Sequence, residues 1–301
     1  MRITVLWYGG TSGMATKYFG ITIDGSTDKK DWNTSSTPPD DNQYEASIIT
    51  LLDKIKQNLA GAAILGFIEG NKHQLTIIPY TDLYIIRHNK KRCNASTDPD
   101  LDADGHPEGK EWYTNADLHD KSGAREDTSG KKGTGRGSDV HVCFNPNQTD
   151  VASGKGTSCF TSTLGGLPDE VLFHEIIHAL RFMKALDLGK PTYGKNLEHY
   201  DNEEEFLAIV ITNVYMSAWG LKDFRADHFG YKKAPYQTTA DFLSDADNLK
   251  TLTNNYADFA DVYQLLALIP GSVAAFNPFR ELVNNGPKYG QPAYEKFLPW
   301  F

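Results

Sequence analysis

The residues best suited to chemistry are two histidines and a glutamate in LPDEVLFHEIIHALRFMKALDLG, residues 167–189. His174 and His178 are four positions apart, so in a helix they share one face with Cβ atoms about 5–6 Å apart. Both imidazoles can then bind one Zn²⁺ ion at about 2.0–2.1 Å. Glu175 is rotated by about 100° from His174, which places its carboxylate over a metal-activated water instead of on the metal. The pattern is typical of a hydrolase in which the metal lowers the pKa of water and Glu175 accepts the proton.

The residues around this motif favour metal ligation over histidines that merely fill a core. The helix is apolar on nearly all sides, which predicts that it is buried. Burying two imidazoles and a carboxylate without partners would cost several kcal/mol. Pro168 and Gly189 are typical of the first turn and of the position just after the end of such a helix. We therefore predict one Zn²⁺ per chain.

A catalytic zinc site needs a third ligand, and no histidine follows at the spacing HExxHxxGxxH. Instead, three glutamates open a second apolar helix in NEEEFLAIVITN, although acidic residues in a first turn also complement the helix dipole. We favour Glu205 as the ligand, because the small Ala208 follows one turn later and leaves room for an ion. Glu204 is the alternative, and Glu198 and His199 are further candidates for the third ligand or for a contact to the ligands.

Other polar residues are candidates for supporting roles. Stabilisation of the transition state in such a site requires a donor that faces the metal. His228 and Tyr231 in RADHFGYKK are the candidates, with Tyr215 and Arg181 behind them. Asn213 and Tyr215 lie inside an apolar helix, where we expect them to hold the metal ligands by hydrogen bonds.

These motifs resemble those of the gluzincin metallopeptidases. More closely, the chain is similar to the effector zinc metallopeptidases that bacteria translocate through type III or type VI secretion systems. The resemblance covers about residues 45–285 and follows the order LLDKIKQNLAGAAILGFIEG, HQLTIIP, GSDVHVCFNP, HEIIHALR, NEEEFLAIVITNVY and RADHFG. Only HEIIH and the glutamate helix are specific, and residues 92–138 depart from the pattern. The resemblance implies peptide-bond hydrolysis by a toxin or effector.

Two other interpretations of the same residues stay open. A non-catalytic binding module could use zinc structurally, in which case a fourth protein ligand such as His199 would close the site. A zinc hydrolase could also act on an amide that is not a peptide.

The elements around the motifs predict a single α+β domain, residues 1–301, with a zincin-like fold. A mixed β/α part, residues 1–91, contains strands in RITVLW, GITID, QLTIIPY and DLYIIRH and one helix from about Tyr44 to Gly70. A polar loop or insertion spans residues 92–138. The helical half, residues 139–301, carries the metal site; it begins with a strand in DVHVCFNP, and helices follow at about 167–187, 202–219 and 256–268.

The insertion contains a candidate calcium loop, DLDADGHPEGKE. Asp100, Asp102, Asp104 and Glu111 have the spacing of Ca²⁺ ligands. Pro107 replaces the usual aliphatic residue, and no helix is predicted on either side. We therefore favour an acidic solvated loop.

Composition narrows the class of partner. The net charge of −9 argues against nucleic acid, because phosphate binding requires a basic face. The longest uncharged run, residues 206–221, is too short and too polar to be a transmembrane segment. The start, MRITVLWYGGTSG, lacks the features of a signal peptide. We expect synthesis in the cytoplasm, export by a specialised secretion system, and a protein or peptide substrate; secretion machinery and an immunity protein are further candidate partners.

Overall fold

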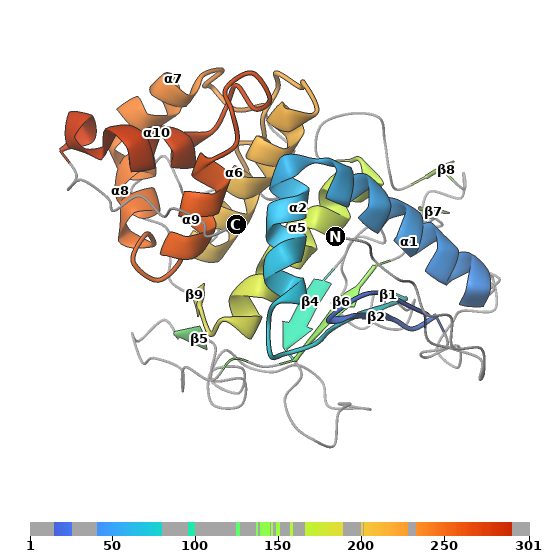
Figure 1. The fold of residues 1–301 in the computed structure, drawn as a ribbon. Helices are drawn as coiled ribbons and strands as arrows, with labels where there is room; N and C mark the ends of the chain where they lie inside the picture. The colour runs from blue at the N-terminus through green and yellow to red at the C-terminus, as the bar shows by residue number, and fades with distance from the viewer. Residues whose placement is uncertain are drawn as a thin grey trace.

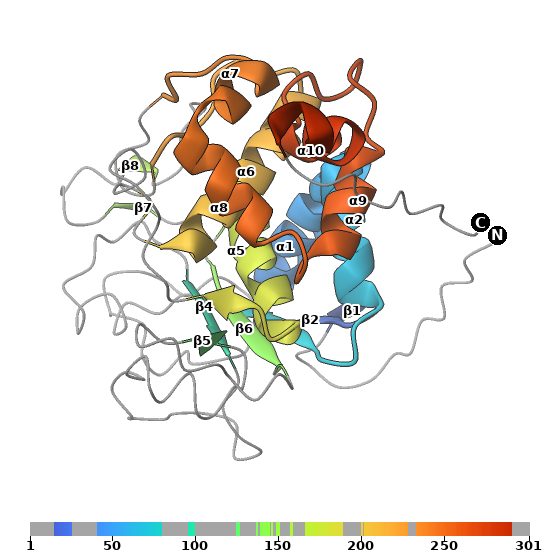
Figure 2. The same ribbon diagram turned by 90° about the vertical axis from the view of Figure 1, so that its left-hand side faces the viewer.

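The computed structural model describes residues 15–25, 41–79, 96–99, 125–126, 137, 139–144, 146, 149–150, 157–158, 166–188, 200, 202–227 and 233–290. Helices lie on a small sheet, and a second group of helices packs on the other side of this layer (Figures 1 and 2). No helix in these ranges is both long and apolar enough to cross a bilayer.

A five-stranded sheet has the order β1-β2-β3-β6-β4. Its strands are β1 (Ala15–Tyr18), β2 (Ile21–Ile23), β3 (Leu75–Ile78), β4 (Ser96–Pro99) and β6 (Val140–Cys143). The three central strands are parallel, whereas β1 and β4 pair antiparallel at the two edges. Burial alternates along β3 and β6, as expected for strands with one face in the core. Two short pairs join β5 (Arg125–Glu126) to β9 (Asp187–Leu188) and β7 (Thr149–Asp150) to β8 (Thr157–Ser158).

The helix expected from about Tyr44 to Gly70 is two helices, α1 (Asp41–Gln57) and α2 (Leu59–Glu69). Asn58 causes the break, because its side chain accepts hydrogen bonds from two backbone N–H groups at the start of α2. Gly61 permits the close approach of the two helices, since a Cβ there would lie 2.0 Å from the carbonyl oxygen of Ile55. The Asn58 amide also donates to the carbonyl of Tyr215 at 2.9 Å, so the break is fixed against α6.

Two long buried helices form the centre of the molecule, α5 (Pro168–Met183) and α6 (Glu203–Ala218). Figure 1 shows α5 beside α2 and above the sheet, with α6 on its other side. The outer side of α6 is covered by α7 (Thr239–Ser244), α8 (Ala246–Asn254), α9 (Ala260–Ala267) and α10 (Pro278–Asn285), and the 3-10 helix η3 (Gly286–Tyr289) follows (Figure 2). Of these, only α9 corresponds to a helix predicted from the sequence.

The fold is thus mixed, with many helices and a small, partly parallel sheet. The prediction that residues 92–138 form only a loop needs correction, because β4 pairs with β6 in the register Ser96↔Cys143. A polar strand with a terminal proline is tolerated there because β4 is an edge strand. The strands predicted in RITVLW and DLYIIRH lie outside the described residues.

Candidate metal centre

Helix starts determine where the candidate ligands lie. Pro168 occupies the first turn of α5, so His174 and His178 fall in the middle of that helix, where both are buried. In α6 the side chain of Asn202 accepts a hydrogen bond from the backbone N–H of Glu205 at 2.8 Å. This cap fixes the first turn of α6, from which Glu204 and Glu205 reach α5.

Three side-chain atoms of α5 and α6 converge on one point. The Nε2 atoms of His174 and His178 are 3.1 Å apart. Oε2 of Glu205 lies 3.3 Å from Nε2 of His174 and 3.4 Å from Nε2 of His178. In a tetrahedral zinc site with bonds of about 2.0–2.1 Å, neighbouring ligand atoms are separated by about 3.3–3.4 Å. The three atoms therefore have the spacing of one face of such a tetrahedron, and they form a group able to hold a metal ion.

Glu204 occupies a different position, although it is adjacent to Glu205. Its Oε1 lies 3.0 Å from Nδ1 of His178, the ring nitrogen that faces away from the other two ligand atoms. Its Oε2 accepts a hydrogen bond from Nε of Arg181 at 2.5 Å. Successive residues of a helix differ by about 100° in direction, and here the two glutamates approach opposite nitrogens of the His178 ring. In this structure Glu205 lies with the two Nε2 atoms, whereas Glu204 contacts the other nitrogen of the His178 ring.

The charges of the cluster suit a cation. Burial lowers the pKa of His174 to about 3, so its imidazole is neutral and has a lone pair to donate. Burial also acts to lower the pKa of His178, but the carboxylates of Glu205 and Glu204 outweigh it and raise that pKa well above its usual range. The pKa of Glu205 is raised by burial and lowered more strongly by the two histidines. Two carboxylates thus lie against two buried imidazoles, and this concentration of negative charge would stabilise a cation.

Glu175 follows His174 in α5 and is buried at the same level of the helix, with 9% of its surface exposed. Several other predicted residues lie outside the described part of the chain: Glu198, His199, His228, Tyr231, and the calcium-loop residues Asp100, Asp102, Asp104 and Glu111. Their roles stay predictions.

Asn213 and Tyr215 make different contacts from those expected. The Asn213 amide brackets the backbone of Arg225, donating to its carbonyl and accepting from its N–H, both at 2.9 Å. The Tyr215 hydroxyl donates to Asp169 at 2.7 Å, and its ring stacks on Phe173 at 4.5 Å. These hydrogen bonds hold α6 against its neighbours, and neither reaches a candidate ligand in the described structure.

Arg225 is a residue that sequence reasoning missed. It is buried, its backbone is bracketed by Asn213, and its charge helps to lower the pKa of His174. It therefore lies close enough to influence the candidate metal-binding residues His174, His178 and Glu205. The indication in the sequence was its position in RADHFG, three residues before the candidate His228.

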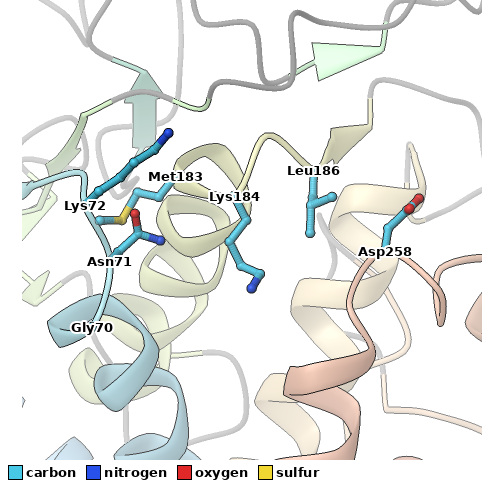
Figure 3. Close-up of a pocket in the computed structure, with 7 residues that line it drawn as sticks. All are labelled: Gly70, Asn71, Lys72, Met183, Lys184, Leu186 and Asp258. Carbon is cyan, nitrogen blue, oxygen red and sulfur yellow. The ribbon is translucent and has the colours of Figure 1, made fainter.

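A separate hollow of about 470 Å³ opens where α2 and α5 end. Figure 3 shows its lining of Gly70, Asn71, Lys72, Met183, Lys184, Leu186 and Asp258. None of these residues is among the candidate metal ligands, so the hollow is distinct from the candidate metal centre.

Comparison with known proteins agrees with this chemistry. The model of the Peptidase_M91 family, described as effector protein, matches residues 33–254, which is most of the chain. Among solved structures, the chain is similar to the light chain of Clostridium botulinum neurotoxin serotype F, with 13% identity and a TM-score of 0.36 over 88% of this chain and 76% of that one. That similarity is too low to support a conclusion. Comparison with curated proteins gives no significant match. The expected resemblance to effector metallopeptidases is confirmed by the family match: the chain belongs to the Peptidase_M91 family of effector proteins and is a metallopeptidase.

Proposed function

We propose that this chain is a zinc-dependent endopeptidase whose metal is held by His174, His178 and Glu205. The observation that carries the proposal is the set of three ligand atoms only 3.1–3.4 Å apart. Two imidazoles and one carboxylate form a donor set that zinc prefers in catalytic sites with three protein ligands. Because Glu205 comes from α6 and both histidines from α5, folding of this helix pair assembles the site.

Glu175 is the proposed general base and acid. When bound, zinc would supply Lewis-acid polarisation and lower the pKa of a water to near neutrality. The carboxylate of Glu175 accepts the proton of the attacking water and later donates it to the nitrogen of the leaving amine. Its position next to His174, rotated by about 100° around α5, keeps it beside the ligands without making it one of them.

Membership of an effector family supports a protein substrate and an action outside the producing cell. We propose delivery by a specialised secretion system, with an immunity protein as a further partner where the target is a rival bacterium. The calcium loop predicted at residues 100–111 is no part of this proposal.

The test compares cleavage by the wild type and by Glu175→Gln. Both proteins, loaded with zinc, are incubated with a proteome lysate, and new peptide N-termini are mapped. We expect new N-termini from the wild type alone, while both proteins contain one zinc per chain. Equal cleavage by Glu175→Gln would exclude Glu175 as the base. If the zinc-loaded wild type cleaved none of a diverse set of proteins, peptides and amides, that result would contradict a hydrolase.

A further inference from the structure

A buried charged pair lies directly behind one of the proposed zinc ligands. Glu204 binds Nδ1 of His178 through one carboxylate oxygen and Nε of Arg181 through the other, at 3.0 and 2.5 Å. The Arg181 side chain is 1% exposed and that of Glu204 is 6% exposed. Arg181 is on α5, one turn after His178, whereas Glu204 is on α6, so the pair also joins the two helices that carry the ligands.

Arg181 is itself held in place from two further directions. Its terminal nitrogen donates to the carbonyl of Leu186 at 2.6 Å, and the Leu186 N–H donates back to the carbonyl of Arg181 at 2.8 Å. Ala185 makes this possible by adopting a left-handed conformation with φ 59°, which turns the chain sharply after α5. The turn is seen beside Leu186 in Figure 3. On its other side, the guanidinium lies 5.0 Å from the centre of the Phe259 ring, just before α9.

We infer that Glu204 and Arg181 are positioning residues that fix His178 for metal binding. This inference rests on the proposed function. An Nδ1–H that donates to Glu204 leaves the lone pair on Nε2, the atom that faces Glu205 and His174. A histidine whose second nitrogen is held by a carboxylate also keeps its ring orientation and is a stronger ligand.

Arg181 adds a second constraint, which concerns which glutamate binds the metal. By occupying Oε2 of Glu204, it holds that carboxylate against His178. This bond joins Nε to one carboxylate oxygen, and the guanidinium is also held by the Leu186 carbonyl and the Phe259 ring. The carboxylate therefore cannot turn toward the ion without losing a charge-assisted hydrogen bond. Arg181 thus keeps Glu204 out of the coordination sphere and leaves the third position to Glu205.

The test uses Glu204→Gln, with Glu203→Gln as a matched control. Glu203 is the preceding residue of α6 and is equally buried, but its carboxylate accepts a hydrogen bond from Asn255 at 2.8 Å. Zinc affinity is measured by competition with a chelator, and the cobalt-substituted proteins are compared by visible absorption. We expect Glu204→Gln to bind one zinc at saturation, with an affinity about 10–100-fold lower and an altered cobalt spectrum. Glu203→Gln should match the wild type in both.

Two results would overturn the inference. Unchanged affinity and an unchanged cobalt spectrum in Glu204→Gln would show that the carboxylate has no influence on His178. Complete loss of zinc at saturation would show that Glu204 is a ligand. Neither result is confused with a failure of the proposed function, which would appear as a wild type that binds no zinc.

Glu204→Gln leaves the buried Arg181 charge without its partner, so folding is checked by circular dichroism and thermal unfolding of the metal-free proteins. If that variant does not fold, the double variant Glu204→Gln/Arg181→Met, which removes both charges, decides by the same criteria. Arg181→Met alone tests the second constraint. Released from Arg181, Glu204 should compete with Glu205, so Arg181→Met should make zinc binding less sensitive to Glu205→Gln. Full sensitivity would contradict the role given to Arg181.

Discussion

Two polar clusters bridge the same pair of helices, α5 and α6, and they differ in chemistry. At the start of α5, Asp169 accepts hydrogen bonds from the Tyr215 hydroxyl and the Lys54 ammonium, both at 2.7 Å. In the middle of α5, His174 and His178 meet Glu205 with all three ligand atoms within 3.4 Å of one another.

The two clusters differ in whether their polar atoms are already paired with one another. Around Asp169 each short contact joins a donor to a carboxylate oxygen, so the charge of Asp169 is balanced within the cluster. This cluster therefore stabilises the packing of the helices. Around Glu205 two imidazole nitrogens and a carboxylate oxygen are crowded at the spacing of metal ligands. Buried polar groups are therefore not equivalent: convergence of metal-ligand atoms indicates a cation site, whereas donor–acceptor pairing indicates structural support.

The largest effect that distinguishes the two clusters is expected at Glu205. Glu205→Ala should lose zinc and peptidase activity below detection, because the variant removes one of three ligands and leaves only the two histidines. Metal analysis and a cleavage assay measure both effects. Retention of one tightly bound zinc by this variant would show that another residue is the third ligand.

Glu175→Gln should lower kcat by about 10²–10⁴-fold, the range for a lost general acid–base group. Zinc content should stay at one per chain, since Glu175 is not among the ligand atoms. Steady-state kinetics on a cleaved peptide give kcat, and a loss of less than about tenfold would argue against the assigned role.

Asp169→Asn should affect stability instead of chemistry. It removes a buried charge that accepts two hydrogen bonds, so the free energy of unfolding should fall by about 1.5–3 kcal/mol, measured by urea unfolding. Zinc content and kcat of the folded protein should not change. As a control, Lys56→Gln breaks a more exposed pair with Glu69 and should cost about 0–1 kcal/mol. Loss of zinc in Asp169→Asn would erase the distinction between the clusters.

The smallest effect is expected at Ala185, where φ is 59°. Glycine adopts this conformation without steric cost, so Ala185→Gly should raise the free energy of unfolding by about 0.5–1 kcal/mol. Ala63→Gly, inside α2, should lower it by about 0.5–1 kcal/mol. Changes of the same sign in both variants would show that the turn after α5 is not strained.

The sequence was informative where a pattern is local. The spacing of His174 and His178 within an apolar run predicts a buried helix with both rings on one face, because helix geometry alone decides it. The parallel strands were also visible as short apolar runs. The choice between Glu204 and Glu205 depends on how α6 approaches α5, which no local pattern contains.

Other features were hidden for identifiable reasons. The break at Asn58 interrupts an apolar spacing that continues on both sides, so one long helix was predicted. Strand β4 was missed because Ser96–Pro99 is polar, and only its pairing with β6 makes it a strand. Arg181 was a secondary candidate for a donor that faces the metal, after His228 and Tyr231. In the structure it contacts Glu204 and the carbonyl of Leu186, which follows the turn at Ala185.

The most direct test of the metal centre is X-ray absorption at the zinc edge of the reconstituted wild type. We expect one zinc per chain with two imidazoles and oxygen ligands at about 2.0–2.1 Å and no sulfur. Signals from a third imidazole or a thiolate, or no bound zinc at all, would contradict a centre built from His174, His178 and Glu205.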